Sequence, residues 1–470
     1  MRRPGIIILG LLLSGCMVGP DYVRPKLDIP SAFFYEEKEA ADTANTGWWR
    51  QFDDPELDSL IAEALANNRN VRIAAANVEQ GAAVLTQVRS PLFPQIGYGG
   101  GGTRERATEL GATPVPAAVP NPQTSYQALA SARWEIDLWG RIRRLTEAAR
   151  ADLLATEEAR RGVILSLVSS VAADYIQLLG LDEQLEISKR TLANYGESVR
   201  IFELQFRYGQ VSRMNVEQAR TQYETAAAAI PQLESQIVQT ENALSVLLGR
   251  NPGPIARSGK LRQLALPPVP AGLPSDLLLA RPDIGEAEQN LIAAGARIGA
   301  AKARYFPTVS LTGIFGFTSS DLSNLFRGPA RTWSYAGSFS GPIFTGGAIS
   351  GGVKQAEAAR KAALANYELT IQGAFADVEN TLAARRKLVE QVAAQERLVR
   401  ASSEYVRLSR LQYDEGYSPY ATVLQAEQQL FPAELNYGQS RAGLFISLVN
   451  IYKAMGGGWQ AASELTEAGR

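Results

Sequence analysis

Two proline-free stretches, residues 142–207 and 349–414, have the hydrophobic and polar pattern of very long helices. Both are rich in Ala, Leu, Glu, Arg and Gln, which are strong helix formers. At about 1.5 Å per residue, each helix would be roughly 100 Å long, far beyond the usual globular length. The same pattern predicts four other helices, over 55–90, 213–248, 283–304 and 420–454.

Specific residues mark the ends of several of these helices. Gly209 and Gly416 follow the two long helices and are expected to stop them, because glycine adopts the left-handed conformation of a C-terminal cap. Asp283 and Glu286 form a D-x-x-E pattern, which predicts an N-terminal cap for the helix over 283–304.

Between the helices the period of the pattern changes from 3.6 to 2, which predicts four strands. We expect them at 93–103, 124–139, 307–318 and 332–344, paired as two hairpins with loops near 103–123 and 319–331. In three strands the alternate positions on one face are apolar: Tyr126, Ala128, Ala130, Ala132, Trp134, Ile136 and Leu138, then Val309, Leu311, Phe315 and Phe317, then Trp333, Tyr335 and Phe339. The strand at 93–103 has the weakest alternation.

The chain contains an internal repeat, so the same elements occur twice. "VRIFELQFRYGQVSRMNVEQA" (199–219) aligns with "VRLSRLQYDEGYSPYATVLQA" (406–426) at an offset of 207 residues. Each copy combines a hairpin with long antiparallel helices. The expected division of the chain is a signal peptide at 1–15, an N-terminal segment at 16–54, copy one at 55–250, a linker at 251–280, copy two at 281–455 and a tail at 456–470.

The single cysteine of the chain, Cys16, directly follows a short apolar run. Arg2 and Arg3, the apolar run and the small residues before Cys16 are typical of a secretory signal. "LSGC" resembles a bacterial lipobox, in which the cysteine becomes the lipid-modified N-terminus. We therefore expect Cys16 to be a lipid anchor; the alternative is a buried structural cysteine. Met17 follows in place of the aspartate that retains some lipoproteins at the inner membrane.

The composition argues against several function classes. Without histidine, the chain cannot use Ser-His-Asp or Cys-His catalysis or HExxH zinc binding. A net charge of −1 gives no basic surface for nucleic acid. We expect no enzyme, no cofactor and no resident metal.

Alternating strands occur in half-buried sheets of soluble proteins and in membrane barrels. The strand length and the aromatic residues near strand ends favour a barrel. Four strands cannot close one, and an open edge in lipid leaves peptide groups unpaired. Two copies would give eight strands and a filled interior, whereas three would give twelve and an open lumen.

These features together resemble TolC-type outer-membrane efflux lipoproteins of the NodT/OprM-like family, the outer-membrane component of resistance–nodulation–division pumps. The resemblance covers the mature chain and lies in four landmarks: "GPDYVRP" (19–25), "RPDIGEAEQNLIAAGARIGAAKARYFPTVSL" (281–311), "PIFTGG" (342–347) and "YKAMGGGW" (452–459). It implies an α+β membrane protein of Gram-negative bacteria, a homotrimer whose 12-stranded barrel in outer-membrane lipid continues into a 12-helix periplasmic barrel. It also implies an equatorial belt from 17–54, 250–280 and the tail.

The resemblance implies a passive exit duct for drugs, toxic compounds or metal ions, supplied by an inner-membrane pump through a periplasmic adaptor. The chain has no nucleotide-binding loop of the G-x4-G-K-[ST] type, so energy comes from the partners. The alternatives are a duct for type I protein secretion and a periplasm-spanning structural lipoprotein.

In this family the duct closes at its periplasmic end, which here corresponds to helix-turn-helix tips at 205–215 and 412–422. The candidate gate residues are Arg207, Tyr413, Asp414 and Glu415. The candidate residues for contact with the adaptor are Gly209, Val211, Gly416 and Tyr417. The family often places its gate aspartate one turn further along, where this chain has Gln425. The alternative is that these charges are solvated turn residues.

Overall fold

The computed structural model describes residues 17–26, 33–34, 47–110, 116, 119–267, 269 and 278–457. Cys16, the signal peptide and the tail from 458 onward lie outside the described residues. The chain divides into two compact units. Unit 1 comprises Met1–Lys26, Val78–Thr156 and Ala287–Tyr367, and unit 2 comprises Leu27–Asn77, Glu157–Glu286 and Glu368–Arg470.

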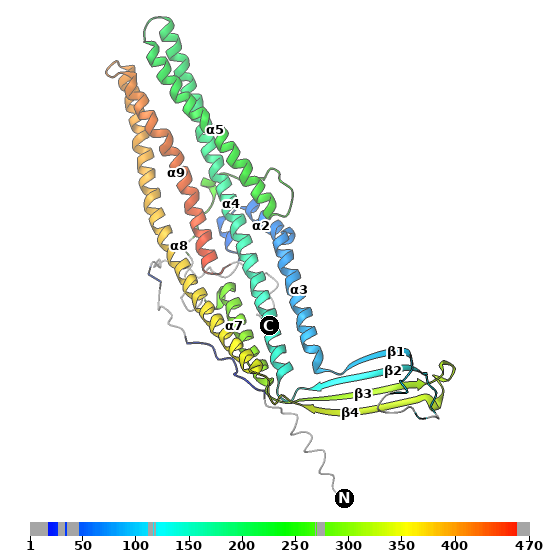
Figure 1. The fold of residues 1–470 in the computed structure, drawn as a ribbon. Helices are drawn as coiled ribbons and strands as arrows, with labels where there is room; N and C mark the ends of the chain where they lie inside the picture. The colour runs from blue at the N-terminus through cyan, green and yellow to red at the C-terminus, as the bar shows by residue number, and fades with distance from the viewer. Residues whose placement is uncertain are drawn as a thin grey trace. The chain divides into compact units, whose positions relative to one another are not determined.

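Unit 1 contains one antiparallel sheet in the order β1-β2-β3-β4 (Figure 1). Its strands are β1 (Gln95–Glu105), β2 (Gln123–Ile136), β3 (Thr308–Ser319) and β4 (Arg331–Ser340). The four expected strands are confirmed with small shifts of their ends. The two hairpins are joined, because β2 also pairs with β3. Leu138 was expected in the second strand but lies beyond the end of β2.

The register places the apolar positions of all four strands on one face. Tyr98 pairs with Ala130, Ala130 with Phe315, and Phe315 with Trp333. Directly paired residues share a face of an antiparallel sheet. The apolar faces of the four strands therefore form one continuous apolar face of the sheet.

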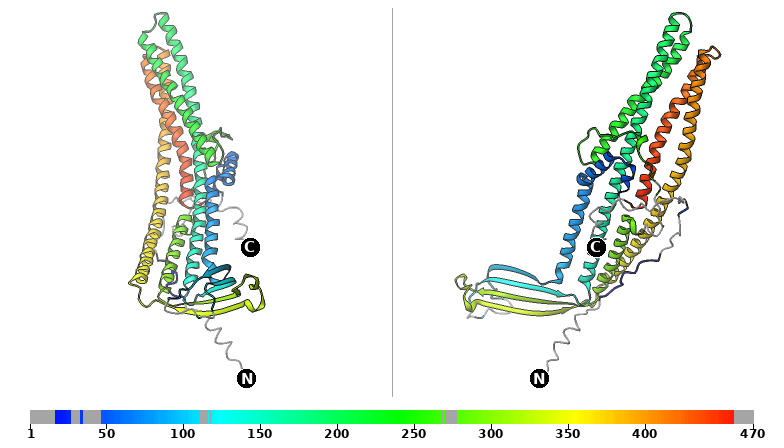
Figure 2. Two further views of the ribbon diagram at one scale, coloured as in Figure 1. Left: turned by 45° about the vertical axis from the view of Figure 1, so that its right-hand side comes forward. Right: turned by 180° about the vertical axis from the view of Figure 1, so that it is seen from behind.

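The long helices are α4 (Arg141–Arg207) and α8 (Ala348–Asp414), each of 67 residues. They are followed by α5 (Arg213–Leu247) and α9 (Tyr420–Ala454), each of 35 residues. In unit 2, α4 pairs with α5 and α8 with α9 (Figure 2). These four helices thus have identical lengths in the two copies of the repeat.

The turns that follow the long helices also repeat. Gly209 and Gly416 have φ angles of 73° and 76°, in the left-handed region. The amide of Gln210 donates to the carbonyl of Gln205, and the amide of Tyr417 donates to the carbonyl of Gln412. These bonds satisfy the last carbonyls of each helix, which confirms that the two glycines act as stops.

The stretch predicted as one helix over 55–90 is two helices, α2 (Pro55–Asn67) and α3 (Arg69–Arg89). Asn68 separates them: its Oδ1 accepts from the amides of Asn70 and Val71, as an N-cap does. Its Nδ2 donates to the carbonyl of Leu247, 179 residues away. The single-helix prediction was wrong because this side chain caps a new helix and bonds a distant one.

The predicted cap at Asp283 was also wrong. The helix α7 (Pro282–Ala303) begins one residue earlier, so Asp283 lies inside its first turn. Its carboxylate accepts two hydrogen bonds from Arg281, at 3.0 and 2.7 Å. It also accepts from the amide of Ile284 at 3.0 Å, so the carboxylate is shared between Arg281 and the first turn of α7.

The largest buried cluster lies in unit 2. Trp48, in the short 3-10 helix η1 (Trp48–Phe52), stacks on Tyr452 with ring centroids 4.9 Å apart. Ile255 and Leu261 join the same cluster. Among the described residues, α4 contains an 18-residue window apolar enough to cross a membrane, and more than half of that window is buried. Such burial is typical of a core helix.

Candidate functional site

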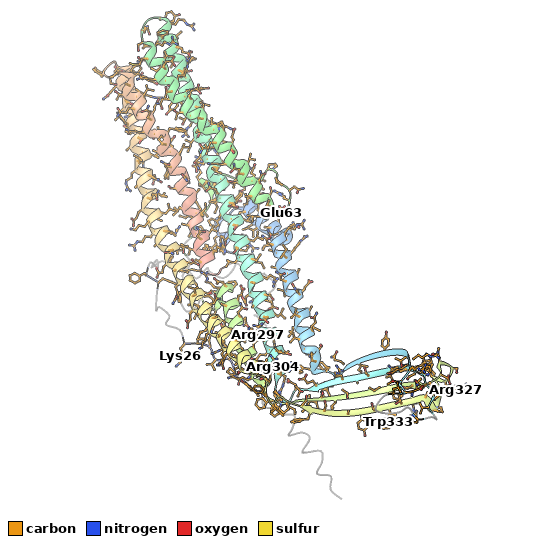
Figure 3. The ribbon with its side chains drawn as sticks, viewed as in Figure 1. Lys26, Glu63, Arg297, Arg304, Arg327 and Trp333 are labelled. Atoms are coloured by element: carbon orange, nitrogen blue, oxygen red, sulfur yellow. The ribbon has the colours of Figure 1, made fainter. Side chains whose placement is uncertain are left out.

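The apolar face of the sheet is exposed in the described part of the chain. The large side chains on it are exposed to 96% at Tyr98, 82% at Tyr335, 65% at Trp333 and 56% at Phe315. Figure 3 shows Trp333 projecting from β4. A soluble half-buried sheet would cover such a face with other side chains. An apolar face of this kind is suited to contact with lipid or with a partner.

The opposite face carries hydroxyl groups along β3 and β4. The Oγ atoms of Ser310 and Ser338 are 2.6 Å apart across the strands. Thr308 and Ser340 form a second hydroxyl pair, at 3.2 Å. Ile314 is an apolar exception on this face, since it pairs with Ser334. The sheet therefore has one apolar and one mainly polar side.

A second feature of unit 1 is the segment just after Cys16, residues 17–24, which we call the strap. Val18 donates from its amide to the carbonyl of Trp139, at 3.2 Å. Arg144 of α4 is 1% exposed and donates to the carbonyls of Val18 and Gly19, each at 3.2 Å. It also bonds Asp21 at 2.8 Å. The strap is thus held where β2 connects to α4.

The strap also approaches α7 closely. A Cβ atom on Gly299 would lie 2.5 Å from the carbonyl oxygen of Val18, whereas one on Gly295 would meet no atom within 4 Å. Further along, Tyr22 and Arg24 both donate to the carboxylate of Glu288, at 2.8 and 2.7 Å. The sequence landmark "GPDYVRP" is therefore a structural attachment segment.

Electrostatics match this geometry. Burial lowers the pKa of the Arg144 guanidinium, but its hydrogen bonds to Asp21 and Glu147 outweigh that effect and the pKa is raised. Arg144 therefore stays charged and keeps its carbonyl partners satisfied. Sequence reasoning did not single it out, because one arginine among many shows no sign of its burial.

The third feature is the pair of helix tips in unit 2. Arg207 and Asp414 are the last residues of α4 and α8, so the structure places them at equivalent positions. Both are exposed, as is Glu415. None of the three forms an ion pair within the part of the chain that the structure describes. Gly209, Gly416 and Tyr417 are exposed in the turns and Val211 is half-buried.

Tyr413 lies in a different environment from the charged gate candidates. Its ring is 6.5 Å from that of Phe202 and 5.2 Å from that of Tyr420, between centroids. It packs against a buried cluster contributed by α4, α5 and α9: Phe202, Val216, Ala219, Tyr420, Val423 and Leu424. Burial raises the pKa of the Tyr420 hydroxyl to about 12. Tyr413 therefore holds the two tips of one chain together.

An ion pair with a buried carboxylate lies below the tips. Arg410 of α8 bonds Glu427 of α9 at 2.5 Å, and the Glu427 side chain is 4% exposed whereas that of Arg410 is 49% exposed. At the equivalent positions of the first copy the charges are exchanged: Glu203 of α4 bonds Arg220 of α5 at 2.7 Å. The exchange is visible in the sequence at the offset of 207, but the difference in burial is not.

Glu427 of this pair also bonds a third helix. The hydroxyl of Tyr195, on α4, donates to the main-chain carbonyl of Glu427 at 3.2 Å. Burial lowers the pKa of Arg410, but the hydrogen bond to Glu427 outweighs it, with Asp414 contributing, and the pKa is raised. The Arg410 guanidinium thus stays charged, and the hydrogen bonds around Glu427 join α4, α8 and α9.

Most of the chain matches a known protein family. Residues 60–250 and 273–457 match the family described as outer membrane efflux protein. The two matched ranges include nearly all of both copies of the repeat.

Similar proteins cover almost the whole chain. The probable efflux pump outer membrane protein TtgC of Pseudomonas putida is 38% identical, over 97% of this chain and 95% of the relative. The cation efflux system protein CusC of Escherichia coli is 35% identical, over 96% of this chain and 98% of the relative. The open-state crystal structure of the Neisseria gonorrhoeae MtrE outer membrane channel has a TM-score of 0.86 and 32% identity, covering 95% and 99% of the two chains.

Proposed function

Because the chain belongs to the outer membrane efflux protein family, we propose that it is the passive outer-membrane duct of a tripartite pump. In this proposal three copies close their four-stranded sheets into a 12-stranded barrel in the outer membrane. Their helices form a 12-helix tunnel in the periplasm. An inner-membrane pump of the resistance–nodulation–division type delivers the cargo through a periplasmic adaptor.

The observation that carries this proposal is the sheet. It has an exposed apolar face, an opposite face with hydroxyl groups, and too few strands to close by itself. A barrel of three copies would place the apolar face against lipid and the polar face towards an aqueous lumen. The curated relatives include a cation efflux protein and efflux pump proteins, which suits a duct for toxic compounds or metal ions.

Lipidation of Cys16 is part of the proposal, and the strap supports it. Because Val18 bonds Trp139, just beyond the end of β2, an acyl chain on Cys16 would start near the end of a membrane strand. We expect Cys16→Ser to lose labelling by a palmitate analogue. The outer-membrane fraction should still contain the trimer, since the barrel has far more apolar contact than acyl chains do. Unchanged labelling would contradict the anchor.

We also propose that the exposed tips form the gate, with Asp414 and Glu415 as an acidic constriction and Arg207 of neighbouring tips as its latch. Tyr413 narrows the closed tip by holding the hairpins together. The exposed turns, with Gly209, Val211, Gly416 and Tyr417, are the contact surface for the adaptor.

Planar-bilayer conductance tests the duct and its gate together. The wild-type trimer should conduct weakly, and both Arg207→Ala and the double variant Asp414→Ala/Glu415→Ala should conduct more. Exposed ion pairs contribute only about 0–1 kcal/mol each, so the latch depends on threefold repetition. Arg200→Ala is the matched control, because its pair with Glu197 stays on one helix. Wild-type currents in all variants would contradict the gate, and a trimer without any channel would contradict the duct.

A further inference from the structure

The outer strands of the sheet each have an unpaired edge among the described residues. β1 pairs with β2 only, and β4 with β3 only. In lipid, each unpaired peptide group costs several kcal/mol. All neighbouring strands are antiparallel, so β4 and β1 also have opposite directions, and they have similar lengths of 10 and 11 residues. β1 of a second copy therefore fits the edge of β4.

The edge strand β1 has a gap in its apolar face. Gly100 and Gly102 occupy successive positions on that face. A Cβ atom on Gly102 would approach the ring of Tyr126 to 2.9 Å, so that glycine is already covered from β2. A Cβ atom on Gly100 would meet only the carbonyl oxygen of Gln127, at 3.3 Å. No side chain of the described residues covers Gly100.

The other edge strand, β4, carries an excess of aromatic surface on the same face. The rings of Trp333 and Tyr335 stack with centroids 5.8 Å apart and an angle of 6° between their planes. They are 65% and 82% exposed. On the apolar face, β1 thus lacks a side chain at Gly100, whereas β4 carries the large exposed rings of Trp333 and Tyr335.

The stagger of a closed barrel brings these positions together. A row of paired residues starting at Gly100 crosses the sheet and ends at Arg331. When the barrel closes, Gly100 of the next copy lies opposite a residue of β4 that comes after Arg331, the first residue of that strand. This displacement along β4 is an even number of residues, because the apolar faces of the two copies must match. A displacement of about four residues per copy corresponds to a strand tilt of about 35°, and about six to a tilt of about 45°, the range of membrane barrels.

Both displacements place Tyr335 within reach of Gly100 of the next copy. With four residues the two are directly opposite. With six, Tyr335 is opposite Gly102 and Gly100 is its diagonal neighbour, which an aromatic ring still reaches. Smaller displacements give strands less tilted than those of membrane barrels.

We propose that Tyr335 of one copy covers Gly100 of the next, so that this contact specifies the seam between copies. An aromatic side chain shields the peptide groups of a cross-strand glycine and stabilises the pair. This inference rests on the proposed barrel of several copies. It adds which side chains determine how the copies join.

The placement can be tested with paired cysteines. The double variant Gly100→Cys/Tyr335→Cys, treated with a short bifunctional thiol reagent, should give covalent dimers and trimers in denaturing gels. Ile96→Cys/Tyr335→Cys is the matched control, because Ile96 lies on the same strand and face, roughly 13 Å from Gly100 at about 3.3 Å per residue. The control pair and each single variant should remain monomeric in the gel. The single variants also control for any cross-link through the natural Cys16.

Mass photometry of the same preparations separates the two levels of the proposal. Trimers that cross-link only through the control pair, or through neither pair, would overturn the Tyr335–Gly100 seam and leave the duct intact. A wild-type protein that is monomeric would overturn the barrel and the seam together.

A thermodynamic cycle gives an independent measurement. Tyr335→Ala should lower the temperature at which trimers dissociate in mild detergent. In a Gly100→Ala background the same change should lower it less, because the added methyl group already shields the backbone. Equal losses in the two backgrounds would show that the two residues do not interact, and would overturn the proposal.

Discussion

Phe315→Arg is expected to prevent stable insertion of the trimer, whereas Ile314→Arg is tolerated. Phe315 lies near the middle of β3 on the apolar face, and Ile314 is its neighbour on the opposite face. An arginine facing lipid at the bilayer midplane costs about 2–4 kcal/mol in each copy, and the cost is repeated in every copy of the barrel. An arginine facing an aqueous lumen keeps its hydration.

The two variants are closely matched. Each replaces a large apolar residue at adjacent positions of one strand, with exposures of 56% and 41%. The measurement is the fraction of heat-resistant trimer recovered from the outer membrane, followed by urea stability of the protein folded in lipid vesicles. Equal losses, or a greater loss for Ile314→Arg, would contradict the assignment of the apolar face to lipid.

Arg410→Ala is expected to destabilise the helical tips far more than Arg220→Ala. Removal of Arg410, which is 49% exposed, leaves the buried carboxylate of Glu427 without its cation. The expected cost is below the roughly 3–5 kcal/mol of a pair with both partners buried, but above that of an exposed pair, because the carboxylate itself is out of water. The equivalent pair of the first copy has both side chains 47% exposed, so Arg220→Ala should cost about 0–1 kcal/mol.

Hydrogen exchange of the amides near the tips measures this difference locally. Arg410→Ala should speed exchange in α8, in α9 and in the part of α4 around Tyr195, because Tyr195 bonds the main chain of Glu427. The double variant Arg410→Ala/Glu427→Gln, which also removes the buried charge, should recover part of the protection. Similar exchange in Arg410→Ala and Arg220→Ala would show that burial of the Glu427 carboxylate is without consequence.

The elements that depend on local interactions could be predicted from the sequence. α8 and α9 were expected at 349–414 and 420–454, and α8 differs only by beginning at Ala348. Helix propensity, the absence of proline and a glycine stop act within a few residues of each other, so no distant contact is needed to read them. The charged gate candidates were likewise found at the ends of α4 and α8, where the repeat placed them.

The errors and omissions involve distant contacts. Asn68 ends one helix and begins another while it bonds Leu247, 179 residues away. The Asp283 cap is the exception, because its carboxylate bonds Arg281, only two residues away. The strap was recognised only as a sequence landmark, although it is held by Arg144, more than 120 residues away in the chain.

The sequence by itself determined the twofold repeat, the lengths of its four longest helices, the glycine stops and which strand positions share a face. These follow from backbone geometry and residue period, which are the same wherever the segment lies. Only the tertiary structure decided that the two hairpins form one sheet, that Arg144 is buried under the strap, and that Glu427 is buried while its counterpart Arg220 is half exposed. Burial and strand pairing depend on neighbours contributed by remote segments, and two sequence positions of the same chemical kind can therefore differ by several kcal/mol.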